Sequence, residues 1–439
     1  MKKFWLENIK KKNLNFDYFE LGNSAALYYI LIFLLLPLIV PLALILNNNS
    51  VYVKYIFSQN VPVYSIETFI YLLIGILFLL LGYKFFSFKN LTFKISNLFK
   101  KDWDFKRTFL VFSIVFLINI FIKAIRIFNG GYFHLRESQN FINGKFYSLI
   151  GLLDWFGPIS LAMAFTYYFF LYKTNDYRYK IWQKIAWAAF LVEFFYGFFS
   201  LNRFRAIIPV IIYLIVRHYV YDRSFKRIII FGILIFFILM PVANFYKNPG
   251  NFYFSAGSYK NKTELEHWQF IFESSIGRFN QSKIILNVFD KTDKFLHGKS
   301  LENFFISLGP PRFIWKNKPI TNDGGNKFGR KYGIISPDNF QTSVGPTIIG
   351  DLYMNFGIMG IALGMLFFGA LFRFIFDSLI GKTNILLSGV VIYSVFWIQI
   401  IKGSEDFIAP VWAGLIKLFV ILLFIHFLLV GFKKNNNHQ

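Results

Sequence analysis

The hydrophobic residues of the chain form long runs, and short segments rich in Lys, Asn and Pro separate one run from the next. A helix needs about 20 apolar residues to cross ~30 Å of hydrocarbon. The runs that approach this length predict about ten transmembrane helices, at 25–46, 65–86, 107–128, 148–172, 183–200, 204–221, 228–246, 346–377, 384–401 and 409–431. We therefore expect an all-α polytopic membrane protein.

One of these runs, 346–377, is too long for a single upright helix. We expect it to be tilted, or to be broken near Gly357 and Gly360. A re-entrant start is compatible with the physics of the bilayer where the backbone faces a cavity instead of lipid.

A long polar segment, 247–345, divides the chain into an N-terminal bundle of about seven helices at 1–246, this segment, and C-terminal helices at 346–439. Gly, Pro and Asn mark both of its ends, as they do in loops. Within it, 263–291 alternates apolar and polar residues with a helical period. We expect one or two amphipathic helices near the membrane surface, followed by an irregular segment rich in Pro and Gly.

The formal charge of +24 comes from 47 Lys and Arg against 23 Asp and Glu. Most of the excess lies in alternate short loops, which is the pattern of the positive-inside rule, so nucleic-acid binding is not expected. The rule places both termini in the cytoplasm and makes 247–345 one large extracytoplasmic loop. The chain has no cysteine, which excludes disulfides and thiol catalysis.

Arginines and aromatic residues on the expected outer side are the candidates for substrate binding. Guanidinium groups grip phosphate through two parallel hydrogen bonds and stay protonated. The candidates are Arg203, Arg205, Arg278, Arg312, Lys318, Arg330, Trp315 and Tyr353. The alternatives for each cation are that it extends to the membrane surface, anchors a turn to lipid headgroups or pairs with an outer carboxylate, and these apply to Arg126 as well. The alternative for the aromatic residues is that their rings form an interfacial belt.

Three carboxylates on the same side, Asp351, Glu405 and Asp406, are the candidates for general base catalysis. The alternative for Asp351 is to cap its helix or pair with an arginine, and for the other two it is to orient arginines. Glu193 lies inside a run, so we expect it to pair with a basic group or to stay neutral. No metal-ligand spacing and no nucleotide-binding glycine loop is present, so neither a metal nor another cofactor is expected.

Four stretches resemble the bacterial Wzy-type oligosaccharide repeat-unit polymerases, which build O-antigen and capsule-like polysaccharides. They are FFSLNRFRAIIP, SSIGRFN, PPRFIWKNKP and GDLYMNFGIMG, and they cover roughly 200–220 and 274–362. Where the family usually has Gly or Ser before the first arginine, this chain has Asn202.

This resemblance implies glycosyl transfer at the outer leaflet of a bacterial plasma (inner) membrane. A glycan would leave undecaprenyl pyrophosphate and be attacked by a hydroxyl of a second lipid-linked repeat unit, without a metal or nucleotide sugar. Membrane lipids, a flippase and a chain-length regulator of the same pathway are the partners that it implies. An O-antigen ligase, a transporter or flippase of lipid-linked glycans, and a structural membrane scaffold are the alternatives.

Overall fold

The computed structural model of the chain describes residues 17, 19–35, 65–101, 103–130, 151, 153–199, 203–221, 282–310, 314–319, 324–338, 343–380 and 386–430. Over these residues all regular secondary structure is helical, which confirms the all-α prediction. The helices are α2 (Leu21–Tyr29, continued by a π-helical segment, Ile30–Leu35), α5 (Ile66–Phe85), α6 (Lys89–Leu98), α7 (Phe105–Gly130), α10 (Phe156–Lys173), α11 (Tyr179–Phe199), α12 (Arg203–Val220), α17 (Ser282–Lys291), α18 (Lys299–Leu308), α19 (Gly324–Lys331), α20 (Thr347–Leu379), α21 (Leu387–Gly403) and α22 (Ile408–Val430).

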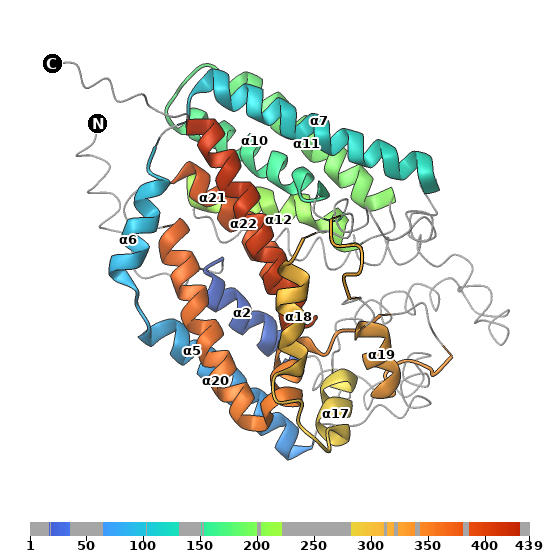
Figure 1. Cartoon of the computed structure of the whole chain (residues 1–439). Helices are drawn as coiled ribbons and strands as arrows, with labels where there is room; N and C mark the ends of the chain where they lie inside the picture. The colour runs from blue at the N-terminus through green and yellow to red at the C-terminus, as the bar shows by residue number, and fades with distance from the viewer. Residues whose placement is uncertain are drawn as a thin grey trace, which may run out of the picture.

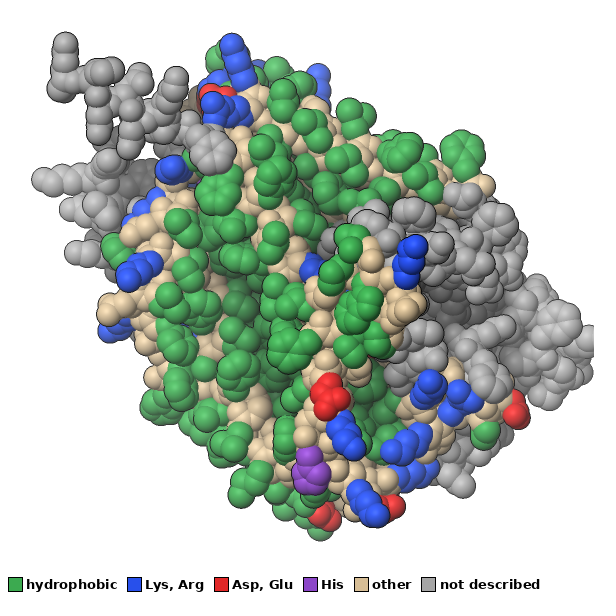
Figure 2. All heavy atoms as spheres, in the orientation of Figure 1, with side chains coloured by type: hydrophobic (Ala, Val, Ile, Leu, Met, Phe, Trp, Pro, Cys, Tyr) green, Lys and Arg blue, Asp and Glu red, His purple; other side chains and the backbone are tan. Residues whose placement is uncertain are grey.

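Four helices are long and apolar enough to span a membrane, namely α5, α7, α20 and α22. Much of their apolar surface faces outward: Leu117 is 65% exposed, Phe367 62% and Phe424 62%. Figure 2 shows that hydrophobic side chains cover the middle of the visible face, while Lys and Arg gather toward its two ends. This distribution is that of a membrane-embedded helical protein. The count of ten spans stays a prediction, and the run 228–246 lies outside the described residues.

The described helices form two groups joined by a central helix. Helices α7, α10, α11 and α12 pack on one another, and α5 packs along α20, which also contacts α2 and α6. Helix α21 contacts α10 and α12 on one side and α20 on the other, as Figure 1 shows. The approach of α5 to α20 depends on small residues, because a side chain at Gly82 would overlap the carbonyl oxygen of Leu366.

The two ends of this bundle differ. At one end lie α17, α18, α19 and the turn between α21 and α22, and we call it the loop end (Figure 1). At the other end α5 and α20 finish and α6 lies beside them, and we call it the α6 end. The assignment of the loop end to the outside of the membrane remains a prediction.

Helix α20 is broken, as predicted, and it reverses its direction. Gly357 has φ 62° and ψ −150°, a conformation outside the helical region. After this residue the chain folds back, so that a side chain at Gly364 would overlap that of Leu352. Backbone N–H groups of Leu296 and His297 donate to the carbonyls of Met354 and Asn355, at 2.8 and 3.1 Å, and satisfy the end of the first half. Residues 347–356 are thus a short helix lying against 358–379.

The described part of the segment 247–345 packs onto the bundle at the loop end. Helix α17 falls within the stretch predicted to be amphipathic, and α18 and α19 follow it. A small apolar cluster of Ile284, Val288, Phe328, Tyr332 and Met354 joins α17 and α19 to the first half of α20. Helix α18 lies along α22, where Lys417 donates to the carbonyl of Ser307. These contacts fix the three loop helices over the turn between α21 and α22.

Candidate functional site at the loop end

A charged cluster joins three helices of the first group near the loop end. Asp154, just before α10, accepts hydrogen bonds through a single oxygen, Oδ2, from Arg126 of α7 and from Arg205 of α12, the latter at 2.8 Å. The Arg205 side chain also lies 5.9 Å from the ring of Tyr196. One carboxylate therefore compensates two guanidinium groups, which leaves one positive charge over.

The two arginines differ in what they offer an anion. The Nε of Arg126 is buried and has no hydrogen-bond partner among the described residues. The Arg205 side chain is 29% exposed, so water or a ligand reaches it. Of the predicted roles, pairing with a carboxylate is the one seen in the described geometry.

The turn between α21 and α22 brings three more charges to the same region. Lys402 lies near Arg205 and Asp154, with its Nζ 5.5 Å from the ring of Phe204. Glu405 accepts a hydrogen bond of 2.6 Å from the hydroxyl of Tyr28. Asp406 is exposed, as Lys402 is. The cluster of Arg126, Asp154, Arg205, Lys402, Glu405 and Asp406 is called the outer charge cluster below.

The two carboxyls of this turn have pKa values above those of free carboxyl groups. Burial raises the pKa of Glu405, an effect that the Tyr28 hydrogen bond opposes and the nearby Asp406 reinforces. Burial likewise raises the pKa of Asp406, although its side chain is exposed to water. The side chain of Asp406 is thus open to water and yet partly surrounded by protein. Raised carboxyl pKa values of this kind are common at catalytic acids and bases.

Helix lengths set the depth of this turn. The end of α20 and the start of α21 lie at a common level, since a side chain at Gly389 would overlap the carbonyl oxygen of Leu379. From that level 358–379 extends ~33 Å, whereas the 17 residues of α21 extend only ~25 Å. The turn that carries Glu405 and Asp406 therefore lies below the rim formed near Gly357. The first half of α20 descends to it, and the N–H of Ile348 donates to the carbonyl of Ser404 at 3.0 Å.

Asp351 is fully buried beside this turn and has its hydrogen bonds satisfied. It accepts from the hydroxyl of Ser300 on α18 at 2.7 Å, from the N–H of Ile408 on α22 at 3.0 Å, and from Asn355. The carboxylate thus ties α18, α20 and the start of α22 together. In this geometry Asp351 is a positioning residue for the turn: it bonds to the first N–H of α22 and to Ser300, and neither caps its own helix nor pairs with an arginine among the described residues.

Lys318 and Trp315 stabilise a local turn. The ammonium of Lys318 donates to the carbonyls of Gly309 and Pro310, at 3.0 and 3.1 Å, and lies 5.9 Å from the ring of Trp315. The PPRFIWKNKP stretch is therefore closed on itself at its described positions. Arg330 lies on α19, two residues beyond Phe328, whose ring contacts that of Phe407 next to Asp406.

Tyr353 belongs to an aromatic cluster at the rim. Its ring centroid lies 4.3 Å from that of Phe289 on α17, 5.9 Å from that of Tyr71 on α5 and 6.0 Å from that of Phe295. The structure thus brings Arg205, Glu405 and Asp406 together around Lys402, whereas Tyr353 contacts aromatic rings of α5 and α17. The side chain of Arg203, which opens α12, and the residues Arg278 and Arg312 lie outside what the structure describes.

Three residues of the site were not identified from the sequence: Asp154, Lys402 and Tyr28. Asp154 carried a signal, because it is the only acidic residue between Glu137 and Asp176 and it precedes an apolar helix. The prediction for Glu193 is confirmed, since Lys123 and Asn119 of α7 bond to its carboxylate. Among the described His, Asp and Glu residues, no group of three or more is placed to hold a metal.

Comparison with known proteins yields no relative. No family model matches the chain, and no curated protein and no solved structure matches it.

Proposed function

We propose that the chain is a membrane glycosyltransferase that polymerises oligosaccharide repeat units carried on undecaprenyl pyrophosphate, with its loop end on the outer face of a bacterial plasma membrane. The sequence resemblance described above supports this reaction. The outer charge cluster supports it independently, because cations and two carboxyls with raised pKa values lie together at the end that carries the long loop.

In the proposed reaction the acceptor hydroxyl loses its proton to the carboxylate of Asp406, and its oxygen forms a bond to the anomeric carbon of the donor glycan. The bond between that carbon and the pyrophosphate breaks, and undecaprenyl pyrophosphate leaves. The guanidinium groups of Arg126 and Arg205 and the ammonium of Lys402 stabilise the charge that develops on the leaving group. Glu405 and Asp351 hold the turn through Tyr28 and Ser300.

One observation carries the proposal: Asp406 is exposed at the turn and its pKa is raised, Lys402 lies beside it, and Arg205 lies near Lys402. General base catalysis is worth about 100-fold or more in rate, and the cations stabilise the leaving group only if they reach it. The proposal therefore makes separate demands on Asp406 and on Arg205.

Purified protein, reconstituted in vesicles with a synthetic lipid-pyrophosphate oligosaccharide, tests the reaction. Wild-type protein should yield a ladder of polymers, and Asp406→Asn and Arg205→Ala should each reduce its rate about 100-fold or more. Arg178→Ala is the matched control, because Arg178 also pairs with an aspartate, Asp176, but lies in the turn at the far end of α10. This variant should polymerise normally.

The same assay separates the rival functions. A wild-type protein that moves the lipid across the vesicle without joining units would be a transporter. One that transfers a single glycan to another acceptor without a ladder would be a ligase. Normal ladders from Asp406→Asn would remove this carboxylate from the mechanism.

A further inference from the structure

A second polar site lies at the α6 end, far along the bundle from the outer charge cluster. It is a pocket of about 510 Å³ between α2, α5 and α20. Its walls are formed by Asn23, Leu80, Tyr83, Lys84, Phe86, Ser87 and Arg373. Two cations, an amide and two hydroxyls thus share one cavity with Leu80 and Phe86, which are both exposed apolar side chains. This mixture suits a ligand that is itself both charged and apolar.

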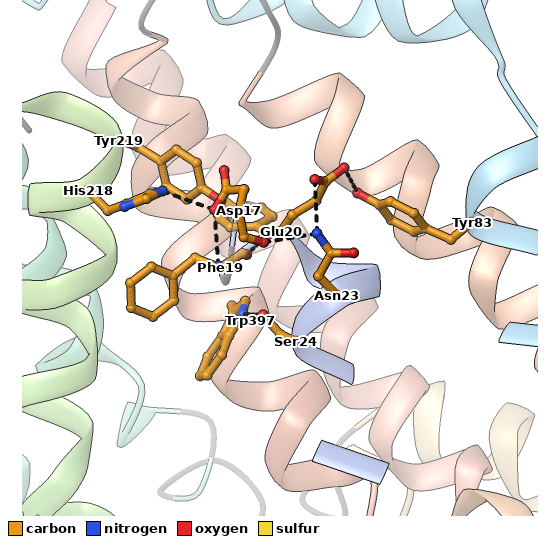
Figure 3. A network of polar contacts seen from close by, with 10 residues as sticks. Asp17, Phe19, Glu20, Asn23, Ser24, Tyr83, His218, Tyr219 and Trp397 are labelled. Carbon is orange, nitrogen blue, oxygen red and sulfur yellow. Dashed lines mark hydrogen bonds and ion pairs between the residues drawn. The ribbon is translucent and has the colours of Figure 1, made fainter. Parts of the chain in front are cut away.

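The polar wall is rigidly built, as Figure 3 shows for Glu20, Asn23 and Tyr83. Glu20 accepts hydrogen bonds from Tyr83 at 2.6 Å and from Asn23 at 3.3 Å. Arg373 bonds to Glu20 at 3.3 Å and to Asp377 at 2.7 Å. The acidic groups near the pocket are therefore already engaged by groups of the wall.

Lys84 is the cation of the pocket that takes no part in this hydrogen-bond network. It lies in the last turn of α5, is exposed, and has its Nζ 6.0 Å from the ring of Phe85. No carboxylate of the described residues lies within ion-pair distance of it. A lysine at the wall of a built pocket without an acidic partner is available to an anionic ligand.

The surroundings of the pocket belong to a membrane surface. Three residues separate helix α6 from the end of α5. Helix α6 exposes Leu91 and Phe93 together with Lys89 and Lys94, and Phe88 just before it is exposed as well. A helix that exposes large apolar and basic side chains in this way lies in the plane of the membrane interface. Because Lys84 precedes α6 by five residues, the pocket opens at the depth of the lipid headgroups.

We propose that this pocket binds the headgroup of an anionic phospholipid, with the phosphate on Lys84 and the acyl chains along Leu80 and Phe86. A volume of about 510 Å³ lies within the range of small-ligand sites. The charge of Lys84, with Arg373 beside it, selects an anion, and the exposed apolar wall selects a molecule with a hydrocarbon tail. The first 16 residues of the chain carry five Lys and one Glu, so their charge does not suit this pocket.

The test measures how much phosphatidylglycerol the full-length protein retains, by native mass spectrometry after purification from vesicles of equal phosphatidylglycerol and phosphatidylcholine. Lys84→Gln should lower retained phosphatidylglycerol about tenfold, as expected for the loss of one charged hydrogen bond to a phosphate held in the pocket. Ser87→Glu should lower it to a similar extent, because it places a carboxylate in the pocket without removing a wall. Lys94→Gln, an equal change of charge on exposed α6, is the matched control and should retain it fully.

Two results would overturn the proposal. If Lys94→Gln loses as much lipid as Lys84→Gln, the attraction belongs to the basic surface in general. If soluble glycerol phosphate at millimolar concentration displaces the lipid completely, the pocket binds free phosphate esters and the apolar wall has no part in it. Melting temperatures of the variants in phosphatidylcholine alone should equal that of the wild type, which shows that each variant is folded.

Discussion

Replacing Gly357 by alanine tests the reversal of α20. The depth of the turn between α21 and α22, relative to Gly357, depends on this reversal. At φ 62° and ψ −150° the backbone occupies a region that is essentially restricted to glycine. A Cβ there would also lie 2.8 Å from Cζ of Phe295, closer than carbon atoms approach without a shift. Strain of this kind costs on the order of 1–3 kcal/mol, and relocating the Phe295 ring adds to it.

Thermal unfolding of the purified protein measures this cost. For large domains 1 kcal/mol corresponds to roughly 2 °C, so Gly357→Ala should lower the melting temperature by roughly 2–6 °C. Gly414→Ala is the control, because Gly414 lies within α22 and the nearest atom to its Cβ would be Nε2 of Gln399, at an ordinary 3.6 Å. Alanine favours a helix over glycine by roughly 1 kcal/mol, so this variant should be as stable as the wild type or slightly more so.

A double variant separates the two sources of the effect. Adding Phe295→Ala to Gly357→Ala removes the clash of the side chains but leaves the backbone strain, so part of the loss should remain. A melting temperature of Gly357→Ala equal to that of the wild type would refute the reversal at this residue. The difference in level between Gly357 and the turn that carries Glu405 and Asp406 would then no longer follow from the helix lengths.

Three further predictions follow from the loop end. Asp154→Asn leaves two arginines without their carboxylate and should cost roughly 1–3 kcal/mol in the free energy of unfolding by denaturant, whereas Asp176→Asn, in a more exposed pair, should change it little. Burial raises the folded-state pKa of Glu405 above 4.5, so the contribution of this group to stability is greatest below about pH 4.5 and declines as the pH rises through the raised pKa. Glu405→Gln should flatten this decline when melting temperatures are measured from about pH 4 to about pH 8. Asp351→Ala should cost roughly 3 kcal/mol and Ser300→Ala roughly 1 kcal/mol, and in a double-mutant cycle the losses should not add, because both remove the same hydrogen bond.

The apolar runs predict the helices well because burial in a bilayer depends on residue type and length alone. Nine predicted runs coincide at least in part with described helices, and the break of the longest was marked by Gly357 and Gly360. The buried charge of Glu193 likewise demanded a partner, and Lys123 supplies it. In these cases the physical requirement lies within one segment or at one residue.

The pairing of charges at the loop end had no such local signal. Asp154 is separated by 28 residues from Arg126 and by 51 from Arg205, and the three meet only because α7, α10 and α12 pack together. Glu405 and Asp406 lie below the level of Gly357 because α21 is shorter than its neighbour α20. The apolar pattern does not locate the ends of helices precisely enough to reveal this difference in length.

Asp351 shows how a reversal of the chain changes the meaning of a residue. At the start of a straight helix this carboxylate would lie at the membrane edge, open to substrate, as the sequence suggests. Because α20 turns back at Gly357, its first half is enclosed between α18 and α22, and Ser300 and Ile408 cover both oxygens. The acid that remains accessible is Asp406, which Asp351 helps to place by holding the start of α22. In the proposed reaction the buried Asp351 therefore positions the turn, and the exposed Asp406 accepts the proton.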